Sequence, residues 1–174
     1  ALASQDGLLK KLVAPVAAPI PALYFRQLQH LIPAGRHVVL AMIAPQAMEA
    51  LVALAAGWRT EILYRGDRAG PEILPPLYEF TWNHTTLQAL KVDRGITYHQ
   101  ILYPPPDHLD RVARLHGRFG EEVMDHLEFV RFDGHAACFG LPLIRFTTAG
   151  RMAAIEATFE AEGCPTFSPH VCTL

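Results

Sequence analysis

The Asp133-Gly134 pair constrains the fold of this chain more than any other feature of the sequence. It stands between two apolar runs, at 127–132 and 136–146. An Asp-Gly pair between such runs is the strongest local signal of a tight turn joining two antiparallel strands. The two runs are therefore predicted to be neighbours in one sheet.

Helices and strands alternate on both sides of this predicted hairpin. The expected segments are a strand at 96–103, a helix at 107–119 that Asp107 can cap, the hairpin, a helix that begins at Thr147 or Thr148 and ends near 162, and an extended segment at 165–173. This β-α-β-β-α-β order is that of a ferredoxin-like split βαβ unit. The second part of the chain is expected to follow it.

The first part of the chain is expected to differ in character. Residues 1–36 are predicted to be an N-terminal arm or linker, because three prolines between positions 15 and 21 interrupt any helix there. Residues 37–174 are predicted to form the folded domain, which begins with a strand at 37–44, a helix at 46–56 and a strand at 60–64. Together these elements predict an α+β fold, with an antiparallel or mixed sheet and helices on one face.

Composition excludes several classes of function. The chain has 174 residues and a net charge of -2 without any basic run, so a nucleic-acid partner is not expected. It has no apolar run long enough to span a bilayer and no signal-peptide pattern. Three widely spaced cysteines do not suggest a disulfide framework, and Cys138 is predicted to be buried. A cytoplasmic location is expected.

Familiar catalytic and metal-binding motifs are absent from the sequence. Although it has nine histidines, it contains no H-x-H, H-E-x-x-H or C-x-x-C spacing, so no metal site is expected. It also lacks a P-loop, a dinucleotide-binding glycine fingerprint and a nucleophile elbow. The chain starts at Ala1 without a methionine and ends at Leu174. We therefore expect one domain of a longer protein, which holds only part of an active site.

Residues 76–100 carry the mixture of side chains that most suggests a binding function. Trp82, Asn83, His84 and two threonines follow one another in what is expected to be the start of a helix. One interpretation is structural: Thr81 or Asn83 caps the helix while Trp82 packs as a hydrophobic staple. The other is a polar wall that faces a ligand, with His84 exchanging a proton near neutral pH.

For two further side chains, His170 and Arg145, both a structural and a functional interpretation remain open. His170 follows Pro169 in the last extended segment, where it could face a ligand or pack as an edge-strand histidine. Arg145 ends an apolar strand, where its guanidinium could bind a carboxylate or remain solvated beyond the sheet.

Several separated stretches of the sequence resemble the substrate domain of FAD-linked oxidases of the vanillyl-alcohol oxidase type. The stretches are Tyr-Glu-Phe-Thr-Trp-Asn-His-Thr-Thr at 78–86, Gly-Ile-Thr-Tyr at 95–98, Leu-Glu-Phe-Val-Arg-Phe-Asp-Gly at 127–134, Leu-Pro-Leu-Ile-Arg-Phe-Thr at 141–147 and Phe-Ser-Pro-His at 167–170. The resemblance covers roughly residues 37–174. It is strongest to the 2-hydroxy-acid oxidoreductases that act on glycolate or D-lactate.

This resemblance implies a substrate-binding cap domain, whose partner is a PCMH-type FAD-binding domain of the same protein. It implies FAD in the full-length protein, none bound to this chain alone, and a small hydroxy acid or alcohol as substrate. His84 and His170 would be catalytic and converge on the flavin side, while Asn83, Tyr98 and Arg145 would bind substrate. An apolar face that meets the FAD domain would be exposed here and could cause self-association.

A second interpretation belongs to another class of function. A ferredoxin-like regulatory or interaction module would bind a small ligand, or pair with a partner through its sheet. The neighbouring sequence in the intact gene product distinguishes the two, because only the first requires an FAD-binding domain.

Overall fold

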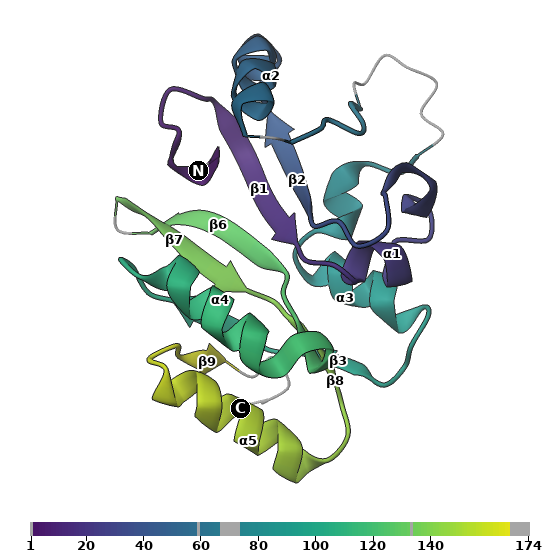
Figure 1. The fold of residues 1–174 in the computed structure, drawn as a ribbon, viewed down its shortest axis with the longest axis vertical. Coiled ribbons are helices and arrows are strands. Elements are labelled where there is room, and N and C mark those ends of the chain that lie inside the picture. The colour runs from purple at the N-terminus through teal and green to yellow at the C-terminus, as the bar shows by residue number, and fades with distance from the viewer. Residues whose placement is uncertain (1, 59, 67–73, 133, 168–174) are drawn as a thin grey trace, which may run out of the picture.

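Mixed helices and antiparallel sheets make up the chain, which confirms the predicted α+β fold. The computed structural model describes residues 2–58, 60–66, 74–132 and 134–167. Within them lie a two-stranded, a three-stranded and a four-stranded sheet (Figure 1). The described part of the chain includes no helix that is both long and apolar enough to cross a membrane.

The four-stranded sheet contains the predicted hairpin. Its strands lie in the order β6-β7-β4-β9 and all neighbours are antiparallel: β6 (Leu127–Phe132), β7 (His135–Gly140), β4 (Gln100–Tyr103) and β9 (Thr166–Phe167). Gly134 has a φ of 77°, the left-handed backbone that a tight turn requires and glycine accepts without strain. The hairpin is confirmed, although Asp133 lies outside the described residues.

Two long helices cover one face of this sheet. They are α4 (His108–Phe119), drawn between β7 and β9 in Figure 1, and α5 (Ala149–Ala161), drawn below β9. The core between helices and sheet includes Ile101, Tyr103, Leu115, Phe119, Leu127, Cys138, Ile155 and Phe159. Thr148 caps α5 as predicted, since its side chain accepts a hydrogen bond from the Arg151 N–H at 3.1 Å. Asp107 makes no such bond for α4 and instead pairs with Arg111 at 3.1 Å.

The strands predicted at 96–103 and 136–146 are each divided between two sheets. β3 (Ile96–Tyr98), β8 (Leu143–Arg145) and β5 (Val123–Met124) form a separate sheet in the order β3-β8-β5. Between β7 and β8 lies Pro142, which has no N–H to continue the ladder. The ferredoxin-like order of the second part is not confirmed, because β5 and β8 interrupt the β-α-β-β-α-β sequence.

The predicted N-terminal arm is in large part built into the fold. β1 (Lys10–Val16) pairs antiparallel with β2 (Val38–Ile43), and α1 (Ile20–Tyr24) follows it. Leu12 and Pro15 both lie within β1, and Pro15 is accommodated there because a two-stranded ribbon has few ladder bonds to lose. β1 also approaches the four-stranded sheet, where Val16 forms an isolated bridge with His126.

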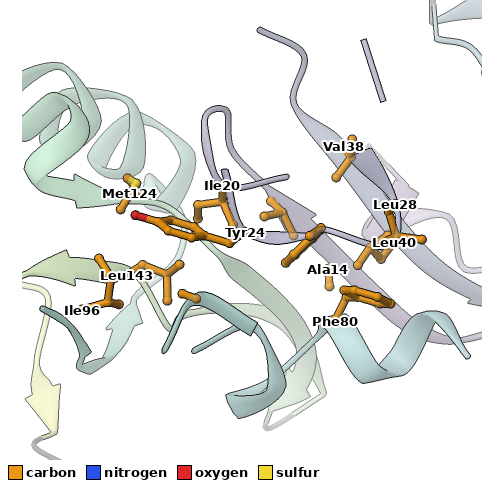
Figure 2. Close-up of a cluster of buried hydrophobic side chains, with 13 residues drawn as sticks. Ala14, Ile20, Tyr24, Leu28, Val38, Leu40, Phe80, Ile96, Met124 and Leu143 are labelled. Atoms are coloured by element: carbon orange, nitrogen blue, oxygen red, sulfur yellow. The ribbon is translucent and has the colours of Figure 1, made fainter. Parts of the chain in front are cut away.

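A second hydrophobic cluster joins this N-terminal segment to the rest of the chain. Figure 2 shows Tyr24, Met124, Leu143 and Ile96 at one end of it, and Leu28, Leu40 and Phe80 at the other. The rings of Phe25 and Phe80 meet edge to face, with their centroids 5.0 Å apart. Apolar burial of this kind is the main stabilising contribution to folding, so residues 14–28 act as part of the core.

The remaining elements are two helices and several short 3-10 turns. The helices are α2 (Met48–Gly57), which was predicted, and α3 (Asn83–Leu90). The 3-10 turns are η1 (Leu2–Ser4), η2 (Gln29–Leu31), η3 (Pro45–Ala47), η4 (Leu77–Phe80) and η5 (Gly120–Glu122). The strand predicted at 60–64 is wrong. The Thr60 N–H and hydroxyl both donate to the Ala55 carbonyl at the end of α2, at 3.3 and 2.9 Å. Ile62 and Leu63 are exposed.

Candidate functional site

The polar segment at 76–100 forms a strained turn between η4 and α3. Trp82 has φ 51° and ψ -142°, and among the described residues it is the only non-glycine with a positive φ. The His84 N–H closes the turn on the Thr81 carbonyl at 3.0 Å. A bulky side chain is rarely found in this backbone region, and such outliers gather at functional sites.

The structural interpretation of this turn, a capped helix with a packed tryptophan, is wrong in detail. Neither Thr81 nor Asn83 caps α3, because Trp82 occupies the N-cap position without a side-chain bond. The Thr81 hydroxyl instead donates to the Tyr78 carbonyl at 2.9 Å. The Trp82 side chain is 47% exposed rather than packed as a staple.

A buried carboxylate supports the turn from beneath. The Trp82 N–H donates to Glu128 Oε1 at 2.8 Å, and His126 Nε2 lies 2.8 Å from the same oxygen. Both side chains project from one face of β6 and its start, and neither is exposed to solvent. Neither residue was predicted from the sequence, although a glutamate within an apolar strand was a signal that could have identified Glu128.

Three buried polar atoms of α3 and of the His126–Glu128 pair have no hydrogen-bond partner in the described part of the chain. They are Glu128 Oε2, His126 Nδ1 and Thr86 Oγ1. The neighbouring Thr85 hydroxyl is satisfied, since it donates to the Phe80 carbonyl at 2.6 Å and lies 3.5 Å from His126 Nε2. Buried polar atoms are usually paired, so this cluster has spare capacity for a water molecule or for a polar group.

His84 lies at the surface beside this turn. Its Nδ1 is 3.0 Å from Glu79 Oε2, and the two side chains are 45% and 40% exposed. A carboxylate at Nδ1 favours the tautomer with the proton on that nitrogen, which leaves Nε2 as a proton acceptor. Asn83, the first residue of α3, is exposed next to it. The turn therefore presents Trp82, Asn83 and His84 together.

Arg145 and Tyr98 lie on the three-stranded sheet. Arg145 stands opposite Ile96, and Tyr98 opposite Leu143. The Arg145 guanidinium already donates to the Glu121 carbonyl at 3.2 Å and lies 3.5 Å from Asp93 Oδ2. β3 contacts α3, so the two groups of predicted residues lie on neighbouring elements. His170 lies outside the described residues, and its predicted convergence with His84 stays a prediction.

A second polar cluster joins α4 to the end of β5. His116 Nδ1 lies 2.7 Å from Asp125 Oδ2, and the rings of His37 and His116 are 6.3 Å apart. Burial raises the pKa of Asp125, although the nearby His116 and His37 oppose that shift. His116 is partly exposed, but its acidic partner is buried.

The cysteines and the surface depressions are weaker candidates for a functional site than the Trp82 turn. Cys138 is buried as predicted, and burial raises the pKa of its thiol to about 12, so it is a poor nucleophile. One shallow depression of about 260 Å³ lies beside the His99–Glu156 pair. A second, of about 430 Å³, is lined by Pro105, His108 and Phe129 with their neighbours. Neither is lined by Asn83 or His84.

Comparisons with known proteins identify no family: no protein-family model matches the chain, and no curated protein matches it. In the described part of the chain, no group of three or more His, Cys, Asp or Glu side chains is arranged to hold a metal ion. The features that bear on function are the Trp82 turn, the buried residues beneath it and the sequence resemblance.

Proposed function

We propose that this chain is the substrate-binding cap domain of a cytoplasmic flavin-dependent oxidoreductase that acts on a small hydroxy acid or alcohol. The observation that carries the proposal is the Glu79–His84 pair at 3.0 Å, beside an exposed Trp82 in a strained turn. This element is one of the stretches in which the sequence resembles the FAD-linked oxidases. Strained backbone and a histidine oriented by a carboxylate are both features of catalytic sites.

In this proposal His84 is the general base. The Glu79 carboxylate accepts a hydrogen bond from Nδ1–H, which leaves Nε2 as the atom that takes the hydroxyl proton of the substrate. Asn83 lies next to it, with an amide that can both donate to and accept from a substrate oxygen. FAD, when bound, supplies the acceptor for the hydride.

The starts of α3 and α5 offer little to the pyrophosphate of FAD. At the start of α3 the Trp82 N–H is already bonded to the Glu128 carboxylate, whose negative charge disfavours a second anion. At the start of α5 the Arg151 N–H is bonded to the Thr148 side chain. The FAD-binding domain of the same protein would therefore hold the cofactor, and this chain would contribute only the substrate side.

An exposed stripe on α3 suits contact with that domain. Asn83, Leu87 and Leu90 recur at helical spacing, and the two leucines are 53% and 38% exposed. With the exposed Trp82 they form a mostly apolar surface on the side of the histidine. In the absence of the FAD domain the same surface would favour self-association.

Arg145 and Tyr98 would anchor the substrate carboxylate from the neighbouring sheet. Arginine binds carboxylates through two parallel hydrogen bonds. Because Asp93 and the Glu121 carbonyl already engage part of the guanidinium, Arg145 would contribute its remaining donors.

Substitution of His84 tests the proposal in the full-length protein that contains this chain. His84→Ala should lower turnover of glycolate or D-lactate by about a hundredfold, the scale for loss of a general base, without loss of bound FAD. His30→Ala, at an exposed histidine of η2, is the matched control and should leave turnover unchanged. Native turnover in His84→Ala would exclude His84 as the base.

The interaction-module alternative retains one supporting observation. The four-stranded antiparallel sheet ends in β9, which spans only Thr166–Phe167 and could be extended by a strand from a partner. An intact gene product with no FAD-binding domain beside this chain would favour this alternative over the cap domain.

A further inference from the structure

We propose that Glu128 is a positioning residue, which holds the Trp82 peptide in its unfavourable backbone conformation and thereby orients Asn83 and His84. The inference rests on the proposed function for its effect on turnover, but its effect on Trp82 can be measured independently. Glu128 lies 46 positions from Trp82 along the chain and touches neither substrate nor flavin in this account.

One hydrogen bond stabilises the strained backbone of the turn. A tryptophan at φ 51° and ψ -142° does not remain there without a compensating contact. That contact is the 2.8 Å bond from the Trp82 N–H to Glu128 Oε1, a charge-assisted bond to a fully buried acceptor. Bonds to a carboxylate are roughly twice as strong as neutral ones and gain further strength away from water.

The carboxylate is itself held in place by a rigid neighbour. His126 Nε2 lies 2.8 Å from the same Oε1 atom, which fixes the direction of the Glu128 side chain. The His126 backbone is fixed in turn, because its carbonyl accepts the Leu141 N–H at 2.8 Å and the residue bridges to Val16 of β1. A group on a braced strand can hold a neighbouring turn to the accuracy that catalysis requires.

The turn transmits this constraint to the two residues that would face the substrate. Asn83 and His84 follow Trp82 directly, and the His84 N–H closes the turn on the Thr81 carbonyl. If the Trp82 peptide rotates, both side chains move with it. Glu128 therefore sets the direction of the His84 ring without contacting it.

The first test measures Trp82 in the native 174-residue chain and in two variants. The coupling constant between its amide and α protons reports φ, and its amide exchange reports the hydrogen bond. Glu128→Leu fills the space without an acceptor and should shift the coupling constant, whereas Glu128→Gln keeps an acceptor oxygen and should retain it. Glu122→Leu is the matched control, because it removes a 2.6 Å ion pair with Arg151 and should leave Trp82 unchanged.

Two results at Trp82 would overturn the inference. One is a coupling constant in Glu128→Leu that equals the native value. The other is a coupling constant in Glu128→Gln that differs from the native value. If Glu128→Leu does not fold, amide exchange of the native chain decides. The Trp82 amide should exchange at least about tenfold more slowly than an exposed amide, and unprotected exchange would contradict the proposed bond.

The second test uses the full-length protein. Glu128→Leu should lower kcat about a hundredfold, as expected when a reacting group is misplaced, and Glu128→Gln should recover most of it. If Trp82 responds as described but the native protein oxidises no hydroxy acid, the positioning of the turn by Glu128 stands and the proposed function fails. A shifted Trp82 with native kcat in Glu128→Leu would overturn the positioning role.

Discussion

Gly140 shows how little space some single residues have in the four-stranded sheet. A Cβ at this position would lie 2.7 Å from Cε2 of Tyr103, whose ring is fully buried against Phe159. A contact that short cannot be relieved without moving the ring or the strand. Gly117, inside α4, is the opposite case, since nothing lies within 4 Å of a Cβ built there.

These two glycines give a matched pair of substitutions. Gly140→Ala should lower the free energy of unfolding by about 1–3 kcal/mol, the usual cost of overpacking. Gly117→Ala should raise it by about 0.5–1 kcal/mol, because alanine favours the helix. Urea denaturation of both variants measures the difference, and equal effects would contradict the packing around Tyr103.

The buried polar residues mark the limit of sequence analysis at this scale. His84 and Asn83 became candidates because unusual polar residues cluster around them in the sequence. Glu128 and His126 were missed, since their importance comes from Trp82, which is distant in sequence and approaches them only in the fold. Nothing in the sequence signals the positive φ of Trp82, because glycine is the residue expected in that backbone conformation.

At the scale of elements, the helices were easier to predict than the strands. α4 and α5 follow from local patterns and from the Thr148 cap, which depend only on nearby residues. The division of 96–103 into β3 and β4 depends instead on which distant strands are available for pairing. The missing strand at 60–64 has the same cause: a β-prone segment needs a partner, and Thr60 is tied to α2.

The contact between α4 and the end of β5 predicts a dependence of stability on pH. Burial raises the pKa of Asp125 in the folded chain, so folding favours its protonated form. This contribution is fully present below the ordinary aspartate pKa of about 3.9 and is lost as pH rises through the higher folded value. Asp125→Asn removes the titrating group and should remove that loss.

Urea midpoints of the native chain and of Asp125→Asn across this pH range provide the measurement. The native midpoint should fall relative to that of the variant as pH rises from about 3.9. Parallel profiles would contradict the burial of the Asp125 carboxylate beside His116.

At the scale of the whole molecule, the N-terminal segment is the largest difference between expectation and structure. The prolines suggested an arm, but β1 pairs with β2, and Ile20, Tyr24 and Phe25 enter the core that also holds Phe80 of the candidate site. Proline content reports helix breaking and not whether a segment is buried. The Trp82 turn therefore depends on residues that were predicted to lie outside the domain.

Truncation of one ring tests this integration. Phe25→Ala should cost about 3–5 kcal/mol of the free energy of unfolding, as expected for a fully buried phenylalanine. Leu9→Ala, at a side chain that is 61% exposed, is the control and should change it by less than about 0.5 kcal/mol. Equal costs in thermal or urea unfolding would mean that residues 1–36 are an arm after all.

The central claim is that this chain forms the substrate side of a flavoenzyme, and anaerobic flavin reduction tests it most directly. The full-length protein is purified, its flavin content is determined, and glycolate or D-lactate is added without oxygen. The account predicts bound FAD whose absorbance near 450 nm is lost on addition of the hydroxy acid, and a loss about a hundredfold slower in His84→Ala. Two results would contradict the account. One is a full-length protein that binds no flavin, and the other is a bound flavin that is reduced neither by these hydroxy acids nor by small alcohols.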